Sequence, residues 1–246
     1  MDGERSAVEV DRLIRLIRIL TEQDQGPPCS GVFDRYLELR GRTLAALGEA
    51  RSGEDIEEAF LELYAHLHMH EASYTPAERR RMDETGGYWA HAGGVSPILK
   101  AGPFISESTV SADLGAGNGL QGLLLQCLDP HRCTIQVEIS SRMVEIGRAL
   151  QEWLGIGAER VEWVVGDVLE QSISGIDFLY LYRPVRPEGV GRGFYERLAR
   201  ELSKSERDVV VFSIADCLRH FLDARFEVFY RDGHLTCMRS ARPEEK

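Results

Sequence analysis

The most constraining feature of this sequence is the glycine-rich segment at residues 110–119, which reads VSADLGAGNG. Its first residues are typical of a buried strand, and Gly115, Gly117 and Gly119 then form a GxGxG turn. Because glycine has no Cβ atom, such a turn can be tight and can come within contact distance of a ligand. Asp113, at the end of the predicted strand, would repel a phosphate but attract an ammonium or sulfonium group. The segment therefore predicts a nucleotide-like cofactor that carries a positive charge.

Two later strand-like segments also end in carboxylates. Residues 134–138 read TIQVE and end at Glu138, at about the spacing expected for the acid that binds ribose hydroxyls in a βαβ nucleotide site. Residues 160–167 read RVEWVVGD and end at Asp167. A fourth strand-like segment, residues 176–182, follows. Because ligands bind at the carboxyl ends of strands in open parallel sheets, we expect these carboxylates to lie together at one edge.

This ordered series resembles the class I S-adenosylmethionine-dependent methyltransferases, over roughly residues 105–240. Residues 208–214 supply a fifth strand, and residues 226–230 and 235–238 supply a terminal hairpin around an Asp-Gly turn. The resemblance implies an α/β fold of Rossmann-like topology. Its sheet would be doubly wound, mostly parallel and seven-stranded, with an antiparallel last strand.

The resemblance also implies S-adenosylmethionine as the cofactor and assigns its binding residues. These lie at the carboxyl ends of the first four predicted strands: Asp113, Gly115, Ala116, Gly117, Glu138, Ile139, Asp167, Val168 and Tyr182. The first four would line the methionine half, Glu138 would bind the ribose hydroxyls, and Asp167 with Val168 would hold the adenine. Tyr182 would border the reacting methyl group and is the first catalytic candidate. Residues 181–184 read LYRP rather than the Asn-Pro-Pro-Tyr that marks methylation of nucleobase and glutamine amino groups, which weakens those acceptors.

Three other functions are compatible with parts of this pattern. A glycine turn without a ligand would leave the carboxylates at three strand ends unexplained. A dinucleotide-dependent dehydrogenase is disfavoured because its loop reads GxGxxG and its domain lacks the final hairpin. A methyltransferase-like regulatory module that binds the cofactor without turnover stays open, because no motif that selects a nucleophile is recognisable. We expect in-line displacement at the sulfonium methyl carbon by a nitrogen, oxygen or carbon nucleophile.

Residues 1–104 show helical periodicity without strand alternation, which predicts a helical cap or extension before a methyltransferase domain at residues 105–246. In the first helix Arg12, Arg15 and Arg18 lie away from the centre of the apolar stripe, so we expect them to face solvent. Residues 75–78 read TPAE, a capping box that predicts a short helix. The extension is expected to cap the sheet or to mediate a homodimer.

Between these two parts, residues 86–94 read GGYWAHAGG. Glycine pairs on both sides of two aromatic residues predict a loop that closes over a ligand, with Tyr88 and Trp89 as substrate contacts and His91 as a candidate base. The alternative is that the aromatic rings only wedge the cap against the core.

After the fourth strand, Arg183 and Arg186 are candidates for binding a substrate carboxylate or phosphate, since guanidinium groups grip such oxyanions bidentately. Solvation is the simpler interpretation of these exposed arginines.

His66, His68 and His70 alternate on a predicted helix, where only two imidazoles and one carboxylate share a face. We therefore predict a half-exposed helix flank and no metal site.

The formal net charge of −11 and the isoelectric point near 5.2 argue against general affinity for nucleic acid or anionic membranes. From this balance we expect a small molecule or a protein side chain as methyl acceptor. The five cysteines form no CxxC pair, no long apolar run occurs, and the N-terminus lacks a signal-sequence pattern. Together these features favour a cytoplasmic enzyme.

Overall fold

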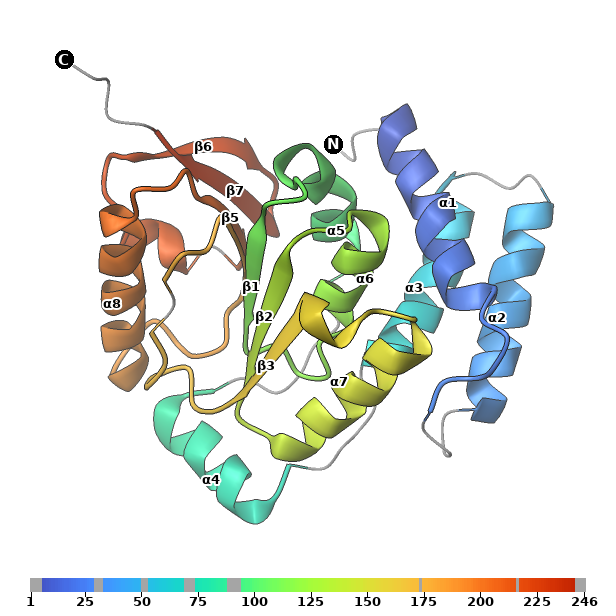
Figure 1. Ribbon diagram of the computed structural model, residues 1–246, viewed down its shortest axis with the longest axis horizontal. Coiled ribbons are helices and arrows are strands. Elements are labelled where there is room, and N and C mark those ends of the chain that lie inside the picture. Colours follow the sequence, from blue (N-terminus) through green and yellow to red (C-terminus); the bar gives the residue numbers. More distant parts are fainter. Residues whose placement is uncertain are drawn as a thin grey trace.

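A computed structural model of the chain describes residues 6–28, 33–49, 53–68, 74–87, 94–172, 174–215 and 217–241. Within these ranges seven strands form one sheet (Figure 1). They are β1 (Val110–Leu114), β2 (Cys133–Glu138), β3 (Val161–Val165), β4 (Phe178–Tyr182), β5 (Val210–Ile214), β6 (Phe226–Arg231) and β7 (Leu235–Ser240). The strand order is β3-β2-β1-β4-β5-β7-β6. Only β7 runs in the direction opposite to the other six strands, so the predicted mostly parallel seven-stranded sheet is confirmed.

The described helices are α1 (Ala7–Thr21), α2 (Phe33–Gly48), α3 (Gly53–His68), α4 (Pro76–Thr85), α5 (Ser96–Ala101), α6 (Leu120–Leu128), α7 (Ser141–Trp153) and α8 (Val190–Lys204). In Figure 1 the helix α8 lies on one side of the sheet, and α6 and α7 lie on the other, with α1–α3 outside them. None of the described helices is long and apolar enough to cross a membrane.

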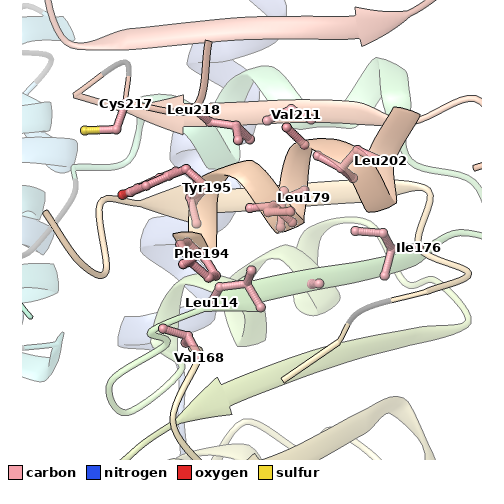
Figure 2. Close-up of a cluster of buried hydrophobic side chains, with 14 of the residues drawn as sticks. Leu114, Val168, Ile176, Leu179, Phe194, Tyr195, Leu202, Val211, Cys217 and Leu218 are labelled. Atoms are coloured by element: carbon pink, nitrogen blue, oxygen red, sulfur yellow. The ribbon is translucent and has the colours of Figure 1, made fainter. Parts of the chain in front are cut away.

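Alternating side chains of the central strands fill a separate core on each face of the sheet. On one face Leu179 and Val211 pack with Phe194 and Leu202 of α8 (Figure 2). On the other face Tyr180, one position along from Leu179, belongs to a cluster with α6. This period of two is expected for strands that are covered on both faces, as in doubly wound folds.

The helices before the sheet pack on α6 through a third core. Leu16 and Ile17 of α1 are fully buried in a cluster that also holds Leu120 and Leu124 of α6. Residues 6–101 form helices and no strand within the described ranges, as predicted, although the division into two domains near residue 104 stays a prediction. The apolar stripe of α1 is therefore buried inside this chain.

Arg12 corrects the expectation that the arginines of the first helix face solvent. Its side chain is 8% exposed and donates to both carboxylate oxygens of Asp129, at 2.5 and 2.8 Å. It also donates to the carbonyl of Ile98 at 2.8 Å. Arg15 and Arg18 are exposed as predicted, although Arg15 also donates to the carbonyl of Leu128 at 3.0 Å. The reason is that this flank of α1 meets α5 and the end of α6, where carbonyl and carboxylate oxygens are available.

The predicted capping box starts α4. The Thr75 hydroxyl accepts from the Glu78 amide at 3.2 Å, and the Glu78 carboxylate accepts from the Thr75 amide at 2.6 Å. In Figure 1 this helix lies apart from α1–α3, near the edge of the sheet. After α4, Gly87 forms an isolated bridge with Val185, and the Arg186 amide donates to the Gly86 carbonyl at 2.9 Å. These contacts fix α4 beside the segment that follows β4.

Candidate functional site

A cavity of about 310 Å³ opens at the carboxyl ends of the parallel strands. All the residues predicted to bind the cofactor line it: Asp113, Gly115, Ala116, Gly117, Glu138, Ile139, Asp167, Val168 and Tyr182. The sheet brings them together because β1, β2, β3 and β4 are parallel neighbours that end on the same side. Their roles as ligand-binding residues stay predictions, but their predicted proximity is present.

The glycine turn requires glycine for two different reasons. Gly115, Gly117 and Gly119 have φ values of 80°, 60° and 69°, in the left-handed region that other residues rarely adopt. A Cβ atom on Gly119 would lie 2.4 Å from the ring of Trp163, so this position is needed for packing. Gly115 and Gly117 line the cavity, and a Cβ atom on Gly115 would also lie 2.8 Å from Cβ of Pro184. The turn thus presents backbone, without side chains, to the cavity at two of its three glycines.

Glu138 joins the turn to the end of β2. One carboxylate oxygen accepts from the Gly117 amide at 2.9 Å, and the other accepts from the Ser140 amide at 3.0 Å. The side chain is almost fully buried, and this burial raises its pKa to about 7 although the amide hydrogen bonds oppose the shift. Each carboxylate oxygen can accept a further hydrogen bond, so the group can still receive ligand hydroxyls.

Asp113 lies in the floor of the cavity. It is 4% exposed, and its register partners are Gln136 in β2 and Tyr180 in β4. Burial, with a smaller contribution from the charge of Glu138, raises the pKa of its carboxyl to about 8. A cation bound beside it would favour the ionised form. The site is therefore electrostatically suited to a positively charged ligand.

Asp167 is held from two sides. One oxygen accepts from the Leu169 amide at 2.9 Å, and the other accepts from Nε of Arg81 at 2.7 Å. Hydrogen bonding to Asp167 raises the pKa of Arg81. Arg81 belongs to α4, and Met82 and Thr85 of the same helix line the cavity. A helix of the N-terminal part thus covers the edge where the resemblance places adenine.

Tyr74, just before α4, also lines the cavity. Burial and the nearby charge of Glu138 raise the pKa of its hydroxyl. No sequence pattern marked Tyr74, Arg81, Met82 and Thr85 as site residues. The capping box located α4, but no local pattern showed where this helix docks.

The residues after β4 and β5 carry backbone strain at the cavity. Tyr182, the last residue of β4, lines the cavity, and its ring centre lies 6.2 Å from that of His234. Arg183 and Ala215 have φ values of 41° and 63°, which are unusual for residues other than glycine, and both line the cavity. Strained residues of this kind cluster at functional sites. Arg186 is not brought to the cavity, and its side chain is exposed.

The end of α3 forms another part of the wall and corrects one expectation. His68 is 8% exposed and lines the cavity, so the prediction of a half-exposed helix flank was wrong for this residue. The side-chain amide of Asn118, in the glycine turn, donates to the Leu67 carbonyl at 2.7 Å and holds the end of α3 there.

Among the described residues no group of histidine, cysteine and acidic side chains suits a metal ion.

Three predicted site residues lie outside the described ranges: Tyr88, Trp89 and His91. The hypothesis of a closing loop at residues 86–94 therefore stays a prediction, as does the role of His91 as a base.

Among known proteins, only solved structures match this chain. No family model matches the chain, and no curated protein matches it. An RNA methyltransferase from Salinibacter ruber, in complex with S-adenosyl-L-homocysteine, is 23% identical and aligns over 62% of this chain and 92% of its own, with a TM-score of 0.44. A putative S-adenosyl-L-methionine-dependent methyltransferase from Methanococcus maripaludis is 15% identical over 61% of this chain and 87% of its own, with a TM-score of 0.47.

TrmN from Thermus thermophilus is 13% identical, with a TM-score of 0.45. The alignment spans 59% of this chain but only 48% of TrmN, so this chain corresponds to about half of that protein. At such identities the comparisons concern the fold alone. The strand order and the single antiparallel strand of this chain define the Rossmann-like fold of the class I methyltransferases, as the sequence resemblance implied.

The prediction against a nucleic-acid partner was wrong. Besides the Salinibacter ruber protein, similar structures include a putative RNA methyltransferase from Pyrococcus horikoshii and a tRNA (uracil-54, C5)-methyltransferase from Pyrococcus abyssi. Net charge is a sum over the whole surface, and binding depends on the charge near the site. The acidic composition of this chain therefore gives no reason to exclude RNA.

Proposed function

We propose that the protein is an S-adenosylmethionine-dependent methyltransferase. The observation that carries the proposal is the convergence of Asp113, Glu138 and Asp167, from the ends of three neighbouring strands, on one cavity beside a glycine turn. Buried carboxylates are costly unless they are paired or bind a cation, which supports a positively charged ligand. The sulfonium group of S-adenosylmethionine is such a cation.

The residues present fit the parts of this cofactor. Asp113 would face the positive methionine half, and Glu138 has oxygen lone pairs left for the two ribose hydroxyls. Asp167, beside the buried Val168, would accept from the adenine amino group. When bound, the cofactor supplies an activated methyl group. The chain's own contribution is to align the acceptor and to exclude water, for which Tyr182 and α4 are placed at the cavity.

Calorimetry tests the cofactor. S-adenosylmethionine and S-adenosylhomocysteine should bind and should raise the melting temperature by mass action, whereas NAD should not. Binding of NAD without binding of S-adenosylhomocysteine would refute the proposal. Asp113→Asn is the matched variant, because it removes the charge and keeps the shape of the side chain.

Transfer of label tests turnover and the acceptor class. The protein is incubated with radiolabelled S-adenosylmethionine and with separated RNA, protein and small-molecule fractions of a host lysate. The methyl acceptors predicted from the sequence, a small molecule or a protein side chain, are two of the three possible outcomes. Label in the RNA fraction is the third. Binding without label in any fraction would favour the alternative of a regulatory module.

A further inference from the structure

We propose that α4 forms a wall of the adenosine half of the cavity, and that the side chain of Met82 packs against the adenine ring. The inference rests on the proposed function and deepens it. The cofactor-binding residues assigned above all lie at the carboxyl ends of the parallel strands, whereas α4 belongs to the helical N-terminal part of the chain. A second part of the chain therefore completes the cofactor site.

The first support is that α4 is anchored on two sides of the cavity. Nε of Arg81 donates to Asp167, after β3, at 2.7 Å. Just beyond the end of the helix, Gly87 forms a bridge with Val185, after β4. Because β2 and β1 lie between β3 and β4 in the sheet, the segment between these anchors crosses the ends of β2 and β1, where Glu138 and the glycine turn lie. In Figure 1 α4 lies at the lower end of the sheet.

The second support is a pair of apolar side chains beside the ion pair of Arg81 with Asp167. Met82 follows Arg81 in the sequence, Val168 follows Asp167, and both line the cavity. Met82 is 6% exposed and Val168 is 8% exposed. Adenine has two apolar faces and an amino group at its edge, and pockets for such ligands combine apolar walls with a few placed polar groups. Two apolar side chains beside a carboxylate match this chemistry.

The third support is the apolar character of the face that α4 turns to the cavity. Thr85, one turn after Met82, also lines the cavity, and its hydroxyl donates within the helix to the carbonyl of Arg81 at 2.8 Å. The polar group of this face is therefore already bonded. A methionine side chain adapts to the shape of a ligand, and its polarisable sulfur makes favourable contacts with aromatic rings.

Methyl NMR tests the contact directly. The five methionines of the chain are labelled with ¹³C at the Cε methyl group, and the Met82 signal is identified by its loss in Met82→Leu. A methyl group stacked on the face of an aromatic ring is shifted upfield by the ring current. Adenosine and S-adenosylhomocysteine should therefore both move the Met82 signal upfield. The signal of Met238, in the core that faces α8, is the internal control and should not move.

Calorimetry measures how much the contact contributes to affinity. Met82→Ala should weaken binding of adenosine and of S-adenosylhomocysteine by the same factor, about tenfold, because only the adenosine that the two ligands share lies against Met82. Met82→Leu keeps an apolar side chain of similar volume, so both affinities should stay within about threefold of the wild type. Arg80→Ala, at an exposed position of the same helix, is the control and should change neither affinity.

An unshifted Met82 signal in a complex saturated with S-adenosylhomocysteine would overturn the inference while the proposed function stands. An unchanged affinity of Met82→Ala for adenosine would overturn it as well. If the alanine variant does not fold, the Met82 signal of the wild type decides. Failure of the wild-type protein to bind S-adenosylhomocysteine would refute the proposed function, and the inference with it.

Discussion

The carboxylate of Glu138 accepts a hydrogen bond from the amide of Gly117 at 2.9 Å and so ties the end of β2 to the glycine turn after β1. The same side chain lines the cavity. One group therefore both shapes the turn and faces the expected ligand. Its replacement should affect stability as well as binding, which separates it from a residue that only contacts ligand.

Glu138→Ala should lower the free energy of unfolding by about 2 kcal/mol even without ligand, because the amides of Gly117 and Ser140 lose their acceptors. It should also weaken binding of S-adenosylmethionine by about 2–3 kcal/mol through loss of the ribose contacts. Urea denaturation and calorimetry measure the two effects. Glu145→Ala, at an exposed position of α7, is the control and should change neither. An unchanged affinity would place the ribose elsewhere.

Asp113 should make the stability of the ligand-free protein depend on pH. Its pKa is raised to about 8, above the unfolded value near 3.8, so the folded state holds the proton over that interval. The contribution to stability is fully present below the unfolded pKa and is lost as pH rises toward about 8. Asp113→Asn cannot ionise, so its melting temperature should fall less than that of the wild type between about pH 5 and about pH 8, by at least about 2 °C. Parallel curves for the two proteins would contradict this.

Arg81 should control access to the cavity. Its ion pair with Asp167 is partly exposed and contributes under about 1 kcal/mol to stability, yet it anchors α4 over the expected adenine site. Arg81→Met should therefore raise the association and dissociation rate constants of S-adenosylhomocysteine by about threefold or more and leave the melting temperature nearly unchanged. Stopped-flow binding measures these rates. Arg80→Met, at an exposed neighbouring position, is the control. Equal rate constants for S-adenosylhomocysteine in the two variants would contradict the prediction.

Arg183 combines a strained backbone with a side chain at the cavity. Arg183→Gly should relieve the strain and stabilise the protein by about 1 kcal/mol, measured by thermal unfolding. Arg183→Lys keeps the charge and loses the planar fork, so it should slow methyl transfer by one to two orders of magnitude if the acceptor carries a carboxylate or phosphate. Cofactor affinity should not change. Wild-type turnover by Arg183→Lys with the acceptor found by label transfer would show that no bidentate contact is made.

The elements with local signals could be predicted from the amino-acid sequence. Apolar, strand-like segments predicted β1 and β4, the glycines predicted the turn before α6, and the capping box predicted the start of α4. The meeting of Asp113, Glu138 and Asp167 was also predictable, because parallel strands end at one edge of a sheet.

Which helices complete the site, and which polar side chains they bury, could not be predicted from local patterns. Arg81 meets Asp167, 86 residues away, and Arg12 meets Asp129, 117 residues away. Helical periodicity shows that a helix has an apolar face, but it does not show which surface that face covers or which polar side chains at its border become buried. For that reason helical periodicity predicts a half-exposed His68 on α3 and a solvated Arg12, whereas the packing of the helices buries both side chains.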